Sequence, residues 1–582
     1  MRVLLLHPED LPDGGAWRRE QWDLFVDLGF AGRDTYANWS RTLKSRVLSI
    51  HQFAGQTESY RWVNQVFERG RGRLLDRIGL DWWEILAMES YQDLHTLYLF
   101  RQLQKEACVG RLELAASRPN RSTRIAEQVF GVPLRYFEPA DGGAVHRTMR
   151  ALRSARKLQF AQIAEIAFDK WDAGYQVRRH FTRRGHAKVA EPSVLLPSAY
   201  SNVTRSVLAY ASLLRDRRFL LITTRRNAVP VKTPTNVTVG SLAAYVRSEK
   251  TALEEGRGLQ EAWQALASRL HSEDEQFRCA ANAGVWDYFT AHLKHGLQLR
   301  EVWSSVLQSE QVAGVLCGDD LNYHTRLPLL LAQKQGLNTV YCSHGALDSG
   351  FFFKKILADS FLVKGDMERE YLERAAAVER EKIFVGAPTN RKYISADSRT
   401  GEGIVFFSQP YEVSGGRAES IYREVIPRLY CVARSNGRKL IIKLHPFESR
   451  RTRQALVNSA LADFGKEVEI VDGVPPERVM SRAWCGVTVD SSVAVECAVN
   501  DIPFFLCGWL DFTGDGYLEQ FARFGVAQVL NSPDDIERIP KMVSDFRPDP
   551  AKLQQIWREA DPSQLDEIMF GTRPARLNPC VC

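Results

Sequence analysis

The chain has 582 residues, of which 45% are hydrophobic and 25% are charged, and its formal net charge is +7 at pH 7. This composition is typical of a globular protein and excludes a disordered chain, and the length predicts two large domains or three to four small ones. The ten cysteines are too few for a disulfide scaffold and favour a reducing, cytoplasmic compartment. No apolar stretch approaches the roughly 18–20 residues that a membrane-spanning helix needs.

Apolar runs alternate with amphipathic helical segments through the first half, which is typical of an α/β fold with largely parallel sheets. Residues 2–7 predict a first strand rather than a signal peptide, because acidic residues follow within ten positions. Further strands are predicted at 111–116, 193–198, 219–224, 313–318 and 338–343. Two long charged segments, about 141–190 and about 238–310, are predicted to be helical insertions.

A basic stripe lies in the first of these insertions. Four arginines recur at every third position, and they are Arg147, Arg150, Arg153 and Arg156. The stripe is either a solvated helix face or a binding surface for an anionic membrane or a polyanionic substrate. Nucleic acid is not a predicted partner, because neither stacking aromatic residues nor a helix-turn-helix pattern accompanies the arginines.

A polar linker, SADSRTGEG, separates the two predicted domains, which are 1–400 and 401–582. Strands and helices alternate again after the linker. The strands are predicted within 403–410, 439–446, 468–473, 485–492, 503–509 and 526–530. We therefore expect the second domain to be an open, doubly wound α/β unit.

The segment KLIIKLHPFE, residues 439–448, predicts a strand that ends at His-Pro. Because side chains alternate along a strand, Ile441, Lys443 and His445 share one face. Ligands of open α/β sheets bind beyond the carboxyl ends of the strands. Lys443 and His445 are therefore predicted to point together at a ligand.

The segment GVTVDSSVAVECA predicts a second strand end, about 45 residues later. Ser491 or Ser492 is placed to cap the following helix, and a helix start at this sheet edge suits phosphate. Glu496, one turn further on, could reach a ribose hydroxyl. The alternative for the serines is capping alone, and for His445 a structural role.

The His-Pro and Ser-Ser segments, with YCSHGALDSG, KIFVGAPTNRKY and VFFSQP, resemble GT-B glycosyltransferases of bacterial surface polysaccharides, particularly those using CMP-activated Kdo or sialic acid. The resemblance implies two Rossmann-like domains that face a central cleft, the first binding the acceptor and the second the donor. His445, Ser491 and Ser492 match the residues that hold the nucleotide phosphate in that family, and Lys443, Glu496 and Gln409 are assigned to the same donor site. It also implies no bound metal and no further cofactor.

An acidic pair is the candidate catalytic group. Asp319 and Asp320 follow one predicted strand and His344 follows the next, so all three are expected in one crevice. A carboxylate there could act as general base or as nucleophile, and Asp320 is favoured. The alternatives are helix capping by the aspartates and a tight turn at His344.

Weaker candidates for contacts with the acceptor or with the sugar carboxylate follow two other strands, and they are His7, Ser201, Asn202 and Arg205. Arginine suits a carboxylate because it binds it with two parallel hydrogen bonds. No metal is predicted, because the chain has neither an H-E-x-x-H motif nor a clustered Cys/His set.

The sequence therefore predicts a glycosyltransferase that is either free in the cytoplasm or peripheral on the inner face of the cytoplasmic membrane. It is predicted to move an acid sugar, Kdo ahead of sialic acid, from a CMP donor to a glycan or glycolipid acceptor. Transfer from a UDP-sugar, or of glycerophosphate from CDP-glycerol, is the alternative within the enzyme class. A non-catalytic module that binds polyanions or membranes through its arginines is the alternative outside it.

Overall fold

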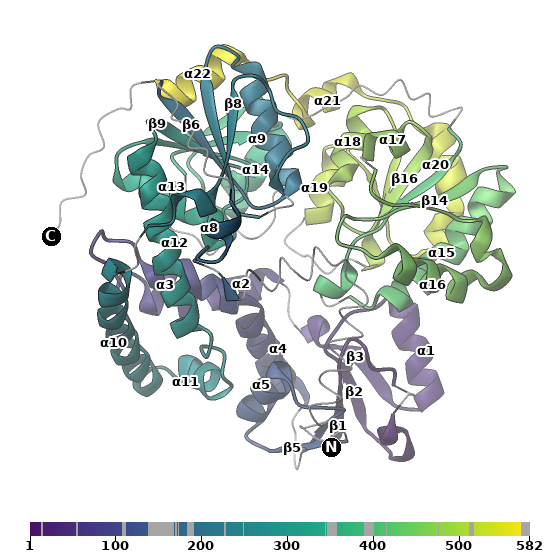
Figure 1. Ribbon diagram of the computed structural model, residues 1–582. Helices are drawn as coiled ribbons and strands as arrows, with labels where there is room; N and C mark the ends of the chain where they lie inside the picture. The colour runs from purple at the N-terminus through teal and green to yellow at the C-terminus, as the bar shows by residue number, and fades with distance from the viewer. Residues whose placement is uncertain are drawn as a thin grey trace.

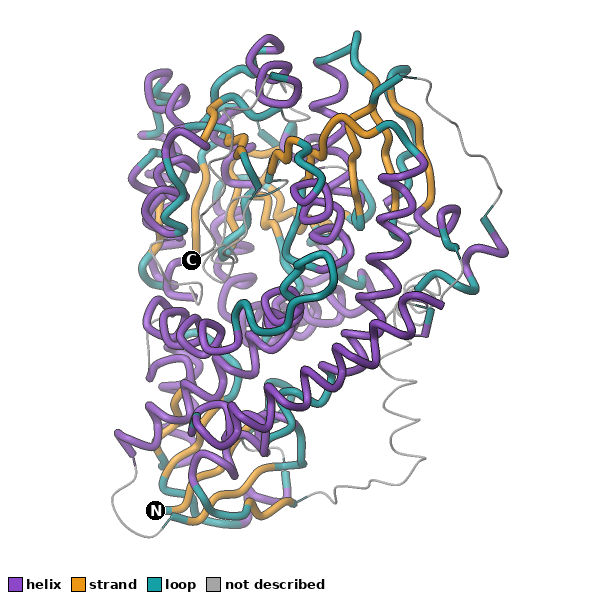
Figure 2. Tube along the Cα trace, turned by 90° about the vertical axis from the view of Figure 1, so that its left-hand side faces the viewer, coloured by secondary structure: helices purple, strands orange, loops and turns teal. Residues whose placement is uncertain are grey.

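The computed structural model describes residues 1–12, 15–53, 56–107, 112–137, 168, 171–172, 174–182, 191–225, 228–247, 250–343, 345, 358–388, 401–414, 416–474, 476–510 and 517–571. These residues form three parallel sheets with helices around them, in units that we name N-terminal, middle and C-terminal (Figure 1). In the side view the sheet near the N-terminus is separated from the other two by helices (Figure 2). The predicted α/β class with parallel, Rossmann-like sheets is confirmed.

The N-terminal unit has a five-stranded sheet in the order β3-β2-β1-β4-β5. Its strands are β1 (Arg2–Leu6), β2 (Leu24–Asp27), β3 (Arg46–Ser49), β4 (Glu113–Ala116) and β5 (Leu134–Tyr136). After Arg2, β1 is apolar and buried, as expected of a central strand that is covered on both faces.

The middle unit has a seven-stranded sheet in the order β12-β11-β10-β9-β6-β7-β8. Its strands are β6 (Ser193–Ser198), β7 (Arg218–Thr223), β8 (Val237–Ser241), β9 (Val312–Cys317), β10 (Asn338–Cys342), β11 (Ser360–Val363) and β12 (Ile383–Val385).

The C-terminal unit has a six-stranded sheet in the order β15-β14-β13-β16-β17-β18. Its strands are β13 (Gly403–Phe407), β14 (Lys439–Lys443), β15 (Glu469–Val471), β16 (Ala483–Thr488), β17 (Phe504–Cys507) and β18 (Gln528–Leu530).

All three sheets share one winding order. Counted within each unit, the strands run 3-2-1-4-5, so the winding direction reverses between the first and the fourth strand. Ligands of such sheets bind at this reversal, outside the carboxyl ends of the strands. The fold therefore offers three candidate crevices, at β1/β4, β6/β9 and β13/β16.

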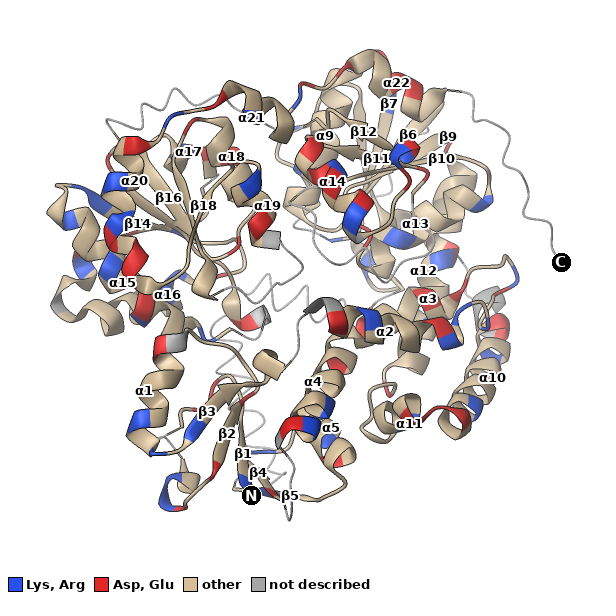
Figure 3. Ribbon diagram, turned by 180° about the vertical axis from the view of Figure 1, so that it is seen from behind, with Lys and Arg blue, Asp and Glu red and all other residues tan. Residues whose placement is uncertain are grey.

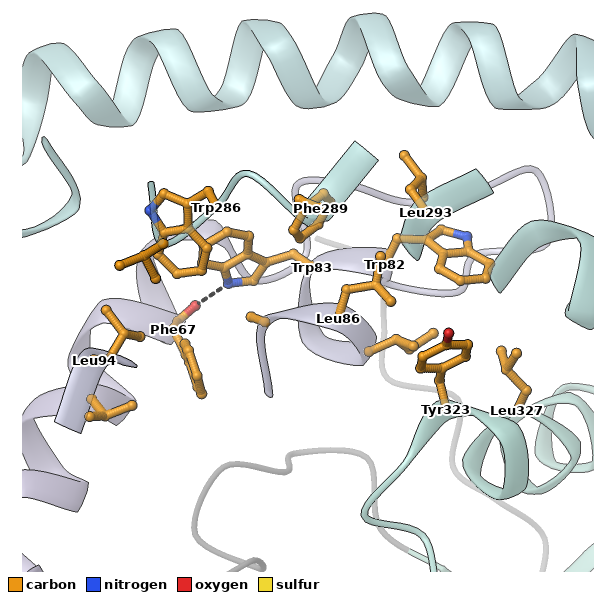
Figure 4. Packing of buried hydrophobic residues seen from close by; sticks show 14 of the residues in the cluster. Phe67, Trp82, Trp83, Leu86, Leu94, Trp286, Phe289, Leu293, Tyr323 and Leu327 are labelled. Atoms are coloured by element: carbon orange, nitrogen blue, oxygen red, sulfur yellow. Dashed lines mark hydrogen bonds between the residues drawn. The ribbon is translucent and has the colours of Figure 1, made fainter. Parts of the chain in front are cut away.

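An aromatic layer joins the N-terminal unit to the middle unit (Figure 4). Trp83, on α3 (Trp82–Ala87), packs with its ring centroid 5.2 Å from that of Trp286 and 6.1 Å from that of Phe289, which begins α12 (Phe289–Ser309). Its indole N–H donates to the carbonyl oxygen of Phe67 at 2.7 Å, so the buried polar group is satisfied. This layer fixes the two units against each other.

The chain returns to the middle unit at its end. Helix α22 (Pro562–Phe570) buries Leu565 and Met569 among residues of the middle sheet. Tyr210 donates to the carbonyl oxygen of Leu565 at 2.6 Å, and Asn338 donates to that of Met569 at 2.8 Å. In the parts of the chain that the structure describes, no helix is long and apolar enough to cross a bilayer.

The structure differs from the predicted organisation in two ways. Residues 1–400 contain two separate sheets instead of one, because the chain completes a five-stranded unit before β6 starts the next. The range 401–582 includes α22, which packs on the middle unit. The predicted helical region 238–310 is largely confirmed by α10 (Lys250–Glu273), α11 (Glu275–Asn282) and α12, whereas most of 141–190 lies outside the described residues.

Candidate functional site

The β13/β16 crevice brings two predicted segments together. Gln409, two residues after β13, accepts from the backbone N–H of Asp490 at 3.3 Å and from the hydroxyl of Thr488 at 3.5 Å. This amide therefore ties the loop after β13 to the loop that carries Ser491 and Ser492. Gln409 thus contacts the strand end that precedes the two serines, and its role in donor binding stays a prediction.

Lys443 and His445 lie at the end of the adjacent strand, β14, and just beyond it. Lys443 is the last residue of β14, is buried, and donates to the carbonyl oxygen of Leu444 at 2.5 Å. His445 is half-buried, and its Nδ1 accepts from the backbone N–H of Phe447 at 3.2 Å. The neutral ring therefore carries its proton on Nε2, which makes His445 a hydrogen-bond donor through that atom.

Burial sets the protonation of this pair. The pKa of His445 is lowered to about 4, first by burial and then by the charge of Lys443, and burial also lowers the pKa of Lys443. His445 is therefore neutral at pH 7. It would contribute an N–H group and no charge to a bound anion.

A pH dependence follows from the lowered pKa. The pKa of an unfolded histidine is about 6.5. Between about pH 6.5 and pH 4, His445 is therefore protonated in the unfolded chain and stays neutral in the folded protein. Stability is therefore lost as the pH falls through this window. Between pH 7 and pH 5 we expect His445→Gln to lose about 2 kcal/mol less unfolding free energy than the wild type, measured by urea denaturation. His271→Gln, at an exposed histidine, should follow the wild type, and equal losses in all three proteins would contradict the prediction.

Glu448 organises the loop, and the sequence reasoning missed it. Its carboxylate accepts from the backbone N–H of His445 (2.7 Å), the hydroxyl of Ser408 (2.7 Å) and Nε of Arg453 (2.5 Å). Both Glu448 and Arg453 are buried. The signal was a glutamate three residues after the histidine, followed by the first turn of α16 (Arg450–Leu461).

The two serines have different roles. The hydroxyl of Ser491 accepts from the backbone N–H of Val493 at 3.4 Å, so Ser491 caps α18 (Val493–Val499). Ser492 occupies the N-cap position but makes no side-chain capping hydrogen bond. Capping therefore accounts for Ser491 and leaves Ser492 unexplained.

The middle unit faces this crevice. A Cβ atom built on Gly345 would lie 3.7 Å from the hydroxyl oxygen of Ser492, so the loop after β10 reaches the start of α18. Lys364, the residue after β11, donates to the carbonyl oxygen of Gly345 at 2.9 Å and pairs with Glu368 at 2.8 Å. Lys364 therefore contacts this loop, and sequence reasoning missed it although it directly follows β11.

Arg205 reaches the same place from α9 (Ser201–Leu213). Its charge contributes to the lowered pKa of Lys443 and acts on Glu496. The side chain of Glu496 keeps solvent-accessible surface, yet the surrounding protein raises the pKa of its carboxyl, which Arg205 and Lys364 partly offset. Ser201 and Asn202 lie on the first turn of the same helix, where Asn202 accepts from the N–H of Val203 at 3.0 Å.

The side chains of the acidic pair, Asp319 and Asp320, interact with other residues of the chain. Asp319 accepts from the N–H of Leu321 at 3.0 Å and from the amide of Asn322 at 2.9 Å. Asp320 is 1% exposed and faces Arg326 at 3.5 Å, which in turn pairs with Glu84 at 2.6 Å. A structural role is therefore shown for both aspartates, and catalysis by either stays a prediction.

His7 lies in a different crevice, at β1/β4. Its ring nitrogens contact the carbonyl oxygen of Arg118 at 3.0 Å and the amide of Asn120 at 2.9 Å. Arg417 of the C-terminal unit fills this crevice, donating to the carbonyl oxygen of His7 at 2.8 Å and pairing with Asp27 at 2.7 Å. His7 is therefore not brought to His445.

Two sequence predictions lie outside the described residues, and they are His344 and the basic stripe of Arg147, Arg150, Arg153 and Arg156. Their roles stay predictions.

No protein-family model and no curated protein matches this chain. Among solved structures, it is similar to S. aureus MnaA with UDP (13% identity, TM-score 0.38, 64% of this chain and 92% of that chain). It is also similar to a UDP-GlcNAc 2-epimerase from Methanocaldococcus jannaschii (11%, 0.40, 65% and 97%) and to the calicheamicin glycosyltransferase CalG4 (12%, 0.40, 65% and 98%).

Proposed function

We propose that the chain is a glycosyltransferase that binds a nucleotide-activated sugar in the β13/β16 crevice. One observation supports the proposal: the carboxyl ends of β14, β13 and β16 are neighbours in the C-terminal sheet, and at or just beyond them lie Lys443 and His445, Gln409, and Ser491 and Ser492, respectively. These residue types are donors for a phosphate group, and the location is where open α/β sheets bind ligands.

Each donor has a stated role in the proposal. The Nε2–H of His445 and the hydroxyl of Ser492 donate to the phosphate oxygens. Lys443 contributes its positive charge from its buried position at the end of β14. Glu496 accepts from a ribose hydroxyl. Arg205, from the middle unit, faces the sugar, and a carboxylate on that sugar would pair with it.

The finer proposal is a CMP-activated acid sugar, Kdo ahead of sialic acid, transferred to a surface glycan. It rests on the motif resemblance and on the cations around the crevice, Lys443 and Arg205. The middle unit would bind the acceptor. To act in catalysis, the carboxylate of Asp319 or Asp320 would first have to break its present hydrogen bonds or ion pair. The proposed function therefore rests on the residues of the nucleotide crevice and not on these aspartates.

Nucleotide binding tests the proposal. CMP is expected to raise the melting temperature, because a ligand that binds the folded form alone stabilises it. His445→Ala should weaken CMP binding about tenfold to a hundredfold by removing one donor to phosphate. Calorimetric titration with CMP, UDP and CDP measures both the affinity and the preferred base.

The matched control is His271→Ala, an exposed histidine on α10, which should bind CMP like the wild type. Preference for UDP would support nucleotide-sugar transfer with a different donor. Equal affinities of the wild type and His445→Ala would show that His445 is structural, and absence of binding by any of the three nucleotides would overturn the proposal.

A further inference from the structure

A second set of cationic and imidazole groups gathers at the carboxyl edge of the middle sheet. Tyr200 follows β6, Arg225 follows β7 and His324 follows β9. Because the order in this part of the sheet is β9-β6-β7, the three loops are neighbours beside the β6/β9 reversal. None of these residues belongs to the proposed nucleotide site.

Two arginines converge at the end of β7. Arg225 donates to the hydroxyl of Tyr200 at 2.6 Å, and its guanidinium lies 4.7 Å from the centre of that ring. Arg178, on α8 (Arg178–Phe181), donates to the carbonyl oxygen of Thr224 at 3.4 Å and pairs with Asp172 at 3.3 Å. Asp172 therefore balances Arg178, and Arg225 adds a second positive charge.

His324 lies beside these charges with a polar atom unsatisfied. Its side chain is 7% exposed, its ring stacks on that of Tyr323 at 4.7 Å, and it is on α13 (Tyr323–Lys334). Among the described residues, its Nδ1 has no hydrogen-bond partner, and the same holds for Nδ1 of His292 on α12. Buried polar atoms without a partner are costly, so such atoms mark a place for a ligand.

The electrostatics agree with this geometry. The pKa of His324 is lowered to about 3, first by burial and then by Arg225, Arg178, His292 and His295. The groups acting on His324 are thus cationic or imidazole side chains. Asp320, on the same loop, is paired with Arg326.

We propose that this edge binds an oxyanion, a phosphate or a carboxylate, between Arg225 and His324. Arginine binds such groups with charge-assisted hydrogen bonds, and an anion beside His324 favours a proton on its Nδ1. Tyr200 links this site to the nucleotide crevice through two ring contacts. The centroid of its ring lies 6.2 Å from that of Phe447, and the centroid of Phe447 lies 5.1 Å from that of His445. If the proposed function holds, the oxyanion belongs to the acceptor.

Titrations at constant ionic strength with inorganic phosphate, glucuronate and glucose test the proposal. The wild type should bind phosphate, glucuronate or both saturably, and glucose not at all. Arg225→Gln should weaken anion binding at least about tenfold. The matched control is Arg218→Gln, at the opposite end of β7, where an exposed arginine pairs with Glu191.

His324→Phe keeps the stacked ring and removes both ring nitrogens. We expect it to weaken anion binding without lowering the melting temperature. Binding of phosphate alone would identify a phosphorylated ligand, and binding of glucuronate alone a carboxylate. Saturable binding of neither anion by the wild type, or undiminished binding by Arg225→Gln, would overturn the proposal. CMP binding should be unchanged in Arg225→Gln. The affinity for CMP therefore tests the proposed function, and the affinity for phosphate and glucuronate tests the anion site separately.

Discussion

Arg417→Met is expected to lower the free energy of unfolding by about 3–5 kcal/mol, because removal of one partner leaves the other charge buried and unpaired. Arg417 is 5% exposed and binds both carboxylate oxygens of Asp27, which is 0% exposed. It also donates to the carbonyl oxygens of His7, Pro8 and Asp10. This residue precedes α15 (Ala418–Ser435), which lies against α1 (Arg33–Leu43) of the N-terminal unit (Figure 3).

Urea denaturation measures the effect, and Arg423→Met is the matched control on α15. Arg423 is exposed and pairs with Glu419 on the same helix, so its loss should cost about 0–1 kcal/mol. The double variant Asp27→Asn/Arg417→Met should be more stable than the sum of the single effects predicts, because no unpaired charge remains. Equal stabilities of Arg417→Met and Arg423→Met would show that Arg417 does not hold the two units together.

Arg326→Met is expected to lower the free energy of unfolding by about 3–5 kcal/mol, because it removes the buried cation that Asp320 and Glu84 share, while Glu84 keeps Arg71 at 3.4 Å. Arg326 is 1% exposed and lies between Glu84 of the N-terminal unit and Asp320 of the middle unit. Lys334→Met, at an exposed position on the same helix, should change stability little. Thermal and urea unfolding compare the two variants.

Asp320→Asn then separates the two roles of this aspartate. If the contact with Arg326 explains Asp320, the variant should lose stability and keep its affinity for CMP. Unchanged stability together with loss of sugar transfer would instead support the catalytic role predicted from the sequence. A stable, fully active Asp320→Asn variant would leave neither role standing.

Strand ends were predictable because their signals are local. The alternation in KLIIKLH placed Lys443 and His445 together, and the apolar runs located β6, β9 and β10 to within two residues. The positive φ of Gly336 likewise follows from its place after a helix. These features depend on residues close in the chain.

The carboxylates that Arg326 and Arg417 bind across units, Glu84 and Asp27, were not predictable, because they come from distant segments. Glu84 is 242 residues from Arg326, and Asp27 is 390 residues from Arg417. The sequence pattern around a strand-end aspartate is the same whether its carboxylate faces a substrate or a buried arginine. The separate N-terminal sheet was missed for a related reason: one long α/β alternation does not show where one sheet ends and the next begins.

The return of α22 to the middle unit bears on how the protein is made. Leu565 and Met569 complete a core whose other members start at Val194, so the C-terminal unit leaves the ribosome before the middle unit can close. Domains generally fold in the order of synthesis. Here the core of the middle unit cannot be completed until α22, the last helix of the described chain, has been synthesised, and part of its apolar surface stays exposed until then.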